Sequence, residues 1–160
     1  MGQNLALSLS LLFLLVTGCA HQQRASAVDG LKRTADTFHQ RCRWKDYRSA
    51  ADLVVPERRE AFLAARERLN DEKDLSISDY DLDELTLSED GKSGRVVSRV
   101  SWTRLPSLSE KSETIRNDFY LVRGEWLLGR SDRGPFVDEL GEAYVPVSDA
   151  PPPEPAPKTP

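Results

Sequence analysis

The stretch TIRNDFYLVRGEWLL, Thr114–Leu128, decides the fold. Apolar and polar side chains alternate along its first half, which is the pattern of a strand with one buried face. The side chains expected to point inward are Ile115, Asn117, Phe119 and Leu121. Arg123-Gly124 is typical of a tight turn, and an apolar run begins two residues after the glycine, at Trp126. The stretch therefore predicts an antiparallel hairpin near the end of the folded domain.

The sequence before this hairpin carries the pattern of two more strands. Apolar residues alternate from Leu75 to Leu87, with phase slips near Asp79 and Asp83 that predict β-bulges. Turn residues over Glu89–Lys92 join this strand to the next one. In that next strand the inward side chains are Val96, Val100 and Trp102. The whole pattern predicts an antiparallel sheet of about four strands with one apolar face.

The residues ahead of the strands have helical spacing, because their apolar side chains recur every three or four positions. The first stripe consists of Val28, Leu31, Ala35, Phe38 and Cys42. A second stripe consists of Trp44, Tyr47, Ala51 and Val54. Pro56 suits the first turn of a further helix, which we expect to end near Asn70. Helices followed by strands predict an α+β fold, with N-terminal helices packed on the sheet.

This order of elements resembles the NTF2-like superfamily of cystatin-like α+β domains. The resemblance covers Val28–Arg130 and rests on FHQRCRWKDYRSAADLVVP, Phe38–Pro56, and FYLVRGEWLLG, Phe119–Gly129. It implies a curved sheet that forms a cone, with the first helix packed into the concave side. Some members of the superfamily are enzymes and others bind small molecules, so the fold leaves the function open.

The N-terminus has the features of an export signal. Its apolar run, Leu5–Val16, is about 12 residues long, whereas a helix that crosses a bilayer needs about 20. The run ends in Leu15–Cys19, which resembles the lipobox of bacterial lipoproteins and implies lipidation of Cys19. Ala20 follows the cysteine, which in such proteins favours the periplasmic face of the outer membrane. The alternative is an ordinary secretory signal with a chance cysteine behind it.

These patterns give a plan of the whole chain. We expect a signal peptide over 1–18, an unstructured polar tether over 19–27, the α+β domain over 28–147 and a proline-rich tail over 148–160. The net charge is -4 and no basic run is present, which argues against a nucleic-acid partner. With Cys19 lipidated, Cys42 has no disulfide partner and is expected to be a buried apolar residue.

Several binding motifs are present only in part. Asp79–Glu84 begins like a calcium loop but lacks the required glycine and the closing glutamate, so an acidic strand face explains it better. Gly91-Lys92-Ser93 lacks the first glycine of a phosphate-binding loop. His39 is the single histidine within the expected domain, which argues against a zinc site. We therefore expect no metal and no cofactor.

Two functions fit this sequence. The first is a non-enzymatic binding or scaffolding module, joined to the membrane by its acylated N-terminus, with envelope proteins or a second copy as partners through the sheet. The second is a small-molecule-binding protein or cavity enzyme of the hydrolase or isomerase type. In that case the polar side chains inside the cone would be His39, Tyr47 and Asn117. On the outer face, Arg99, Arg116, Asp118 and Tyr120 are expected to include cross-strand ion pairs.

Overall fold

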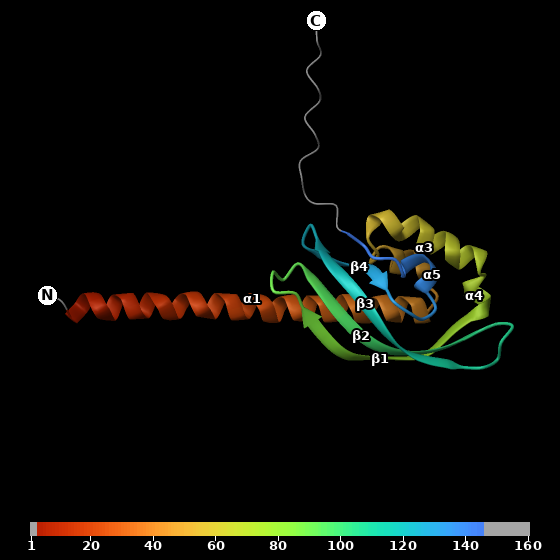
Figure 1. Ribbon diagram of the computed structural model, residues 1–160, viewed down its shortest axis with the longest axis horizontal. Coiled ribbons are helices and arrows are strands. Elements are labelled where there is room, and N and C mark those ends of the chain that lie inside the picture. The colour runs from red at the N-terminus through yellow and green to blue at the C-terminus, as the bar shows by residue number, and fades with distance from the viewer. Residues whose placement is uncertain (1–2, 146–160) are drawn as a thin grey trace, which may run out of the picture.

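A computed structural model describes the backbone of residues 3–145 and the side chains of residues 22–145. The side chain of Cys19 and the tail over 148–160 lie outside these described residues. In chain order the elements are α1 (Gln3–Arg43), α2 (Tyr47–Ala51), α3 (Pro56–Arg68), α4 (Asp71–Asp74), β1 (Leu75–Leu87), β2 (Ser93–Arg104), β3 (Lys111–Val122), β4 (Glu125–Ser131) and α5 (Val137–Leu140). The fold is α+β, as the sequence predicts (Figure 1).

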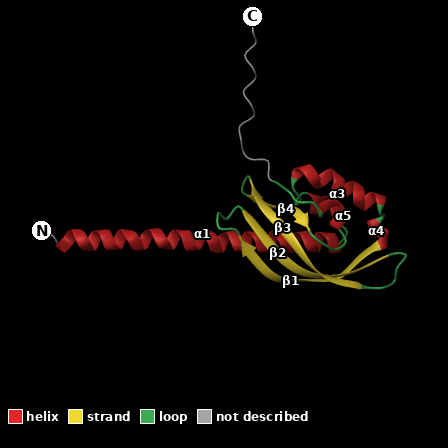
Figure 2. Cartoon of the chain, viewed as in Figure 1, coloured by secondary structure: helices red, strands yellow, loops and turns green. Residues whose placement is uncertain are grey.

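The strands form one antiparallel sheet in the order β1-β2-β3-β4, so each strand pairs with its neighbour in the chain (Figure 2). The register shifts between Ile77 and Asp79, and again between Leu82 and Glu84. These irregularities confirm the bulges predicted from the two phase slips. A third shift, opposite Asp118 and Phe119, is a bulge in β4, where Gly129 is the extra residue; the sequence analysis did not predict it.

Helix α1 packs its apolar stripe against the inner face of the sheet. Leu31, Ala35, Phe38 and Cys42 are all buried, as their spacing predicts. The contact is close: a Cβ on Gly94 in β2 would lie 2.5 Å from Cδ2 of Leu31. Because only glycine leaves that space, the helix rests directly on the backbone of the sheet.

Helix α1 also extends well beyond the sheet toward the N-terminus (Figure 1). The prediction of an unstructured tether over 19–27 is therefore wrong, because the helix runs without a break from Gln3 to Arg43. The side chains of Gln22, Gln23 and Arg24 are exposed, as expected of a polar segment. No helix in the described part of the chain is both long enough and apolar enough to cross a membrane.

The second helical stripe is only partly formed. Trp44 is 75% exposed, contrary to the prediction, whereas Tyr47, Ala51 and Val54 are buried. The physical reason is a sharp turn after α1, in which Lys45 takes a φ of 64° and so cannot continue the helix. Helix α2 then restarts with Asp46 as its N-cap, whose side chain accepts a hydrogen bond from the Ser49 amide at 3.2 Å.

Helix α3 begins at Pro56, as predicted, and fastens the C-terminal segment to the domain. The guanidinium of Arg58 donates to the carbonyl oxygens of Gly129, Leu140, Glu142 and Ala143. The segment before α3 covers the free edge of β4, where the amide of Val55 donates to the carbonyl of Leu128 at 2.9 Å. These contacts close one edge of the sheet and place α5 beside α3.

The side chains expected on the inner face of the sheet are buried there, with one exception, and one further residue was not predicted. Val96, Val100, Trp102, Ile115, Asn117 and Phe119 are buried, as predicted. Leu121 is 38% exposed, because it lies at the end of β3 beside the turn into β4. Ser98 is a second buried polar residue, although its place between Val96 and Val100 in a strand already puts it on the inner face.

The contact between α1 and the core predicts a large effect for Phe38→Ala. Phe38 is buried and packs against Phe62 and Phe136, with ring centroids 6.0 Å and 5.9 Å away. We expect the variant to lose about 3–5 kcal/mol of the free energy of unfolding, because a cavity remains. Urea denaturation measures this loss. Gln40→Ala, an exposed change on the same helix, should cost far less, and equal losses would contradict this packing.

Candidate functional site

Two of the three polar residues expected in the cone meet on the inner face of the sheet. His39 projects from α1 and Asn117 from β3, and the amide nitrogen of Asn117 lies 3.2 Å from Nε2 of His39. Tyr80 of β1 stacks on the imidazole, with ring centroids 5.3 Å apart, and its hydroxyl donates to the Asp36 carboxylate at 3.0 Å. The sequence places His39 and Asn117 among the polar groups that a cone could use but does not pair them, and the bulge at Asp79 obscures the direction of Tyr80.

The imidazole of His39 is neutral at physiological pH. Burial lowers its pKa to about 4, although the negative charge of Asp36 raises it in part. A neutral imidazole keeps a lone pair on Nε2, so this atom accepts the hydrogen bond that the Asn117 amide donates. As a general base, His39 would be too weak near pH 7, because efficient bases have a pKa near the working pH.

These inward polar groups are closed to solvent. The exposed fraction is 3% for His39, 1% for Asn117 and 0% for Ser98. Oγ of Ser98 and Oδ1 of Asn117 have no hydrogen-bond partner among the described residues. Both of these oxygen atoms are closed to solvent. At this point the inner face is a filled core, and a substrate could reach it only after α1 had moved.

Tyr47, the third predicted residue, lies at a different place. Its side chain comes from α2, and the hydroxyl is 3.4 Å from the backbone carbonyl of Asp71 in α4. Burial and the neighbouring Asp71 carboxylate raise the pKa of the Tyr47 hydroxyl, which therefore stays protonated. It does not converge with His39 and Asn117, so the three predicted residues do not form one site.

Beside Tyr47 lies a buried cluster of charges that the sequence analysis did not find. The guanidinium of Arg66 contacts the carboxylates of Asp71, at 2.6 Å, and Glu139, and both partners are buried. Asp71 also pairs with Arg104 at 3.3 Å. The Arg66 guanidinium lies over the Phe136 ring, 4.6 Å from its centroid. These contacts join α3, α4, α5 and β2.

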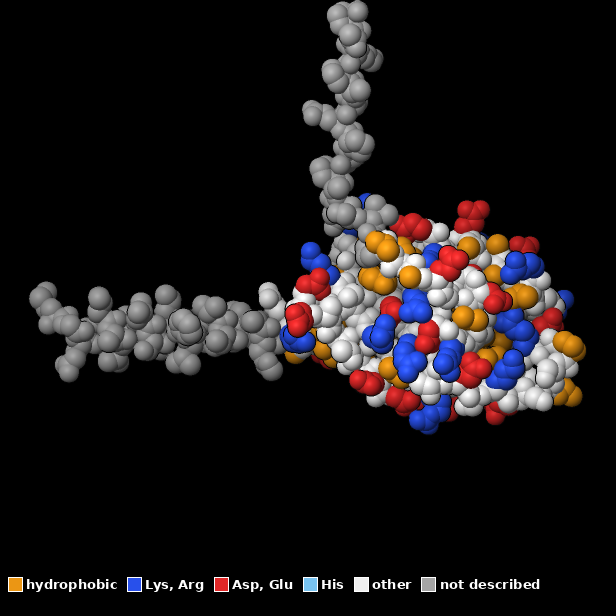
Figure 3. Space-filling model, in the orientation of Figure 1, with side chains coloured by type: hydrophobic (Ala, Val, Ile, Leu, Met, Phe, Trp, Pro, Cys, Tyr) orange, Lys and Arg blue, Asp and Glu red, His pale blue; other side chains and the backbone are white. Residues whose placement is uncertain are grey.

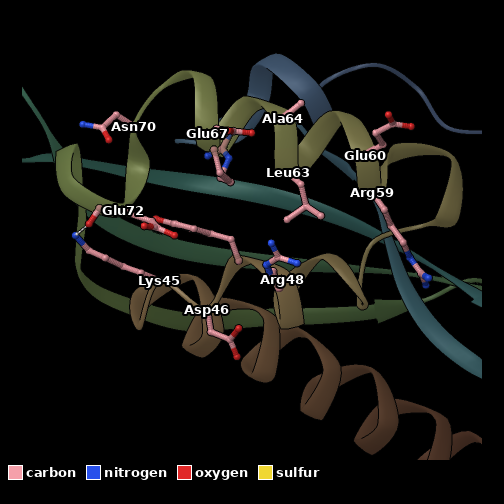
Figure 4. A pocket seen from close by; sticks show the side chains of 12 residues that line it. Lys45, Asp46, Arg48, Arg59, Glu60, Leu63, Ala64, Glu67, Asn70 and Glu72 are labelled. Carbon is pink, nitrogen blue, oxygen red and sulfur yellow. Dashed lines mark hydrogen bonds between the residues drawn. The ribbon is translucent and has the colours of Figure 1, made fainter.

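A groove opens outside this cluster, between α3 and the turn that leads into α2 (Figure 4). Its volume is about 960 Å³, and its lining includes Arg66 at the edge of the cluster. Lys45 on the rim donates to the carbonyl of Glu72 at 2.6 Å. Arg48 from α2 and Leu63 from α3 point toward one another across the groove (Figure 4). The groove therefore offers both charged and apolar contacts that solvent can reach.

The outer face of the sheet carries cross-strand ion pairs, as predicted. The pairs are Arg95–Asp118 at 2.7 Å, Arg99–Asp83 at 3.4 Å and Arg116–Asp132 at 3.3 Å. Lys and Arg side chains gather in front of the strands, with acidic side chains among them (Figure 3). A smaller groove of about 480 Å³ also lies here, with Arg95, Val97 and Tyr120 in its lining. This exposed, paired surface is polar rather than apolar.

The acidic residues of β1 do not form a metal site. Asp79, Asp81, Asp83 and Glu84 are exposed on that strand. Within the side chains that the structure describes, no group of three or more His, Cys, Asp or Glu residues could hold a metal ion.

Comparisons with solved structures find likenesses at low sequence identity. Neither a protein family nor a curated protein sequence matches the chain. A SEC-C motif containing protein from Rhodopseudomonas palustris is 18% identical, with a TM-score of 0.47 over 58% of this chain and 70% of that one. The intermembrane space region of the chloroplast protein ARC6 is 13% identical, with a TM-score of 0.40 over 62% of this chain and 92% of that one. Neither likeness carries an argument about function.

The neutral buried His39 predicts an acid-sensitive fold. The unfolded chain binds a proton at this imidazole below about pH 6.5, whereas the folded chain does so only below about pH 4. Stability is therefore complete above pH 6.5 and falls as the pH drops through this interval, by about 1.4 kcal/mol per pH unit or roughly 3 kcal/mol in all. Urea denaturation across this range measures the fall. In His39→Gln the fall should be smaller, and an identical pH profile would contradict the burial of a neutral imidazole.

The buried charge cluster predicts a strong dependence on Arg66. Arg66→Met leaves the Glu139 carboxylate buried without its cation, and we expect a loss of about 3–5 kcal/mol in the free energy of unfolding. Adding Glu139→Gln should restore part of that loss, because the uncompensated charge is then gone. Chemical denaturation compares the two variants. Arg68→Met, an exposed change on the same helix, is the control, and a loss as large as that of Arg66→Met would contradict the account.

Proposed function

We propose that this protein is a lipoprotein of the bacterial cell envelope, attached by acyl chains on Cys19, and that its folded domain is a non-enzymatic binding or scaffolding module. The short apolar run that ends in a lipobox supports the anchor. Helix α1 supports a mechanical link between anchor and domain, because it reaches the core through Leu31 and Phe38 without a break. Ala20 supports a position on the periplasmic face of the outer membrane.

The observation that carries the binding assignment is the closed inner face of the sheet. The amide nitrogen of Asn117 contacts Nε2 of His39 in the core, and the pKa of His39 is far below the range of an efficient base. A partner would therefore meet the protein at its surface. The groove beside Arg48 and the charged outer face of the sheet are the surfaces open to envelope proteins or to a second copy of the chain.

Membership of the NTF2-like superfamily is part of this proposal. It is supported by the order of elements and by a first helix that packs on the inner face of the sheet. Within that superfamily, this domain would be a member whose cone is filled by side chains such as Phe38 and Phe119 rather than open to a ligand.

One observation favours the alternative of a small-molecule-binding protein or cavity enzyme. His39, Asn117 and Ser98 lie on one inner face, and two of their oxygen atoms have no partner within the described residues. A ligand screen by thermal shift separates the two functions. A compound that raises the melting temperature of the natural protein but not of His39→Gln would favour the alternative. Compounds that stabilise both proteins equally would favour binding at the surface.

The anchor predicts that acylation depends on one of the two cysteines. In cells fed radiolabelled palmitate, Cys19→Ala should take up no label and should leave the membrane fraction, because no thiol remains to carry the lipid. Cys42→Ala is the matched control, since its thiol is buried and its raised pKa keeps it protonated. It should be labelled like the natural protein. Label in Cys19→Ala would overturn the anchor.

A further inference from the structure

The contact between His39 and Asn117 leaves one polar atom of the core without a partner. The amide nitrogen of Asn117 lies 3.2 Å from Nε2 of His39, so the nitrogen end of this side chain is in use. The oxygen end, Oδ1, is buried and has no hydrogen-bond partner within the described residues. Leaving a buried oxygen unpaired destabilises a fold. An oxygen kept at this cost beside a titratable ring points to a second state in which it has a partner.

The two ends of an asparagine side chain have nearly the same shape but opposite hydrogen-bonding roles. The nitrogen donates two hydrogens, whereas the oxygen only accepts. Half a turn about χ2, the last torsion of the side chain, exchanges the two ends, and this torsion has a broad and roughly two-fold energy profile. The backbone of Asn117 is held in the sheet between β2 and β4, opposite Val96 and Ser131. The amide can therefore exchange its ends beside the imidazole without a change in the backbone.

The imidazole of His39 needs opposite partners in its two protonation states. When the ring is neutral, Nε2 carries a lone pair and accepts the hydrogen bond that the Asn117 amide donates. When the ring is protonated, Nε2 carries a hydrogen, and the N–H of Asn117 would then face another N–H. An oxygen at the same place would instead accept a charge-assisted hydrogen bond, which is roughly twice as strong as a neutral one.

Asp36 is the charged group that acts on this imidazole. It lies one turn before His39 on α1, and its negative charge raises the pKa of the ring. Its carboxylate already accepts from the hydroxyl of Tyr80, the β1 residue whose ring stacks on the imidazole. Asp36 therefore favours a proton on His39, but Nε2 faces Asn117 instead. The other polar or charged groups on the neighbouring elements are the exposed Arg43 and buried Cys42 of α1, the exposed Asp79 of β1, the buried Ser98 of β2, and Arg116 and Asp118 of β3, which belong to ion pairs on the outer face.

We propose that the side-chain amide of Asn117 turns over when His39 is protonated, so that Oδ1 accepts a hydrogen bond from Nε2 and α1 stays in contact with β3. The proton comes from the solvent, the bond from the Asn117 amide to Nε2 breaks, and the bond from Nε2 to Oδ1 forms. The amide nitrogen then takes the unpaired place, so the number of unpaired ends is unchanged. This device preserves the contact between helix and sheet in an acidic medium, and it depends neither on the anchor nor on a partner.

The pKa of His39 in Asn117→Leu tests this exchange, because leucine has the same branched shape but neither donates nor accepts. If the amide turns over, Asn117 favours the protonated ring, since the charge-assisted bond is the stronger one. Its loss should then lower the pKa by about half a unit to one unit. If the amide is fixed, its N–H opposes the proton, and its loss should raise the pKa. The measurement is an NMR titration of the full-length chain in a His21→Gln background, which leaves one imidazole.

A second measurement needs no substitution at Asn117. In the ¹⁵N-labelled chain, the scalar coupling between the amide nitrogen of Asn117 and Nε2 of His39 should be present at neutral pH and vanish as the ring is protonated. Ser98→Ala is the matched control, because it removes the other unpartnered oxygen of the inner face, and it should leave the pKa of His39 unchanged. A raised or unchanged pKa in Asn117→Leu, an equal lowering in Ser98→Ala, or a coupling that persists in the protonated ring would overturn the proposal.

Discussion

The packing of α1 against the inner face of the sheet is the contact on which the rest of the structure depends. Leu31 and Phe38 are fully buried there, and each contributes about 1.5–3 kcal/mol through removal of apolar surface from water. The same contact closes the cone, because it places His39 against Asn117. It also fixes the direction in which the N-terminal half of the helix leaves the domain. Stability, the closure of the inner face at His39 and the direction of the proposed anchor thus have one origin.

The sequence predicts what depends on local periodicity and misses what depends on distant pairings. Alternation in β1 locates both bulges, and the sequence places His39 and Asn117 among the polar groups available to the cone without pairing them. The exposure of Trp44 could not be predicted, because it follows from the left-handed turn at Lys45. Periodicity likewise cannot pair Arg66 with Glu139, since these residues are far apart in the chain and on different elements. The helical form of 19–27 was missed because polar composition alone resembles a linker.

The structure separates the buried polar groups from the surfaces where a partner could bind. The core groups, His39 and Asn117, specify how α1 sits on β3, and the cluster around Arg66 holds α3, α4 and α5 together. The remaining charged groups are on surfaces that solvent reaches, including the groove beside Arg48. Under the proposed function, such a domain would act through its position and its surface. That is consistent with a module placed at a membrane by a helix rather than by a flexible linker.

The most direct test of this account is the distance between spin labels at Gln22→Cys and Gln40→Cys, measured in the lipidated protein in vesicles on a Cys42→Ala background. Both positions are exposed on α1. One continuous helix predicts a single narrow distribution centred near 27 Å, from 1.5 Å per residue. A broad distribution would show that a flexible tether precedes the domain. It would contradict the claim that α1 joins the proposed anchor rigidly to the core.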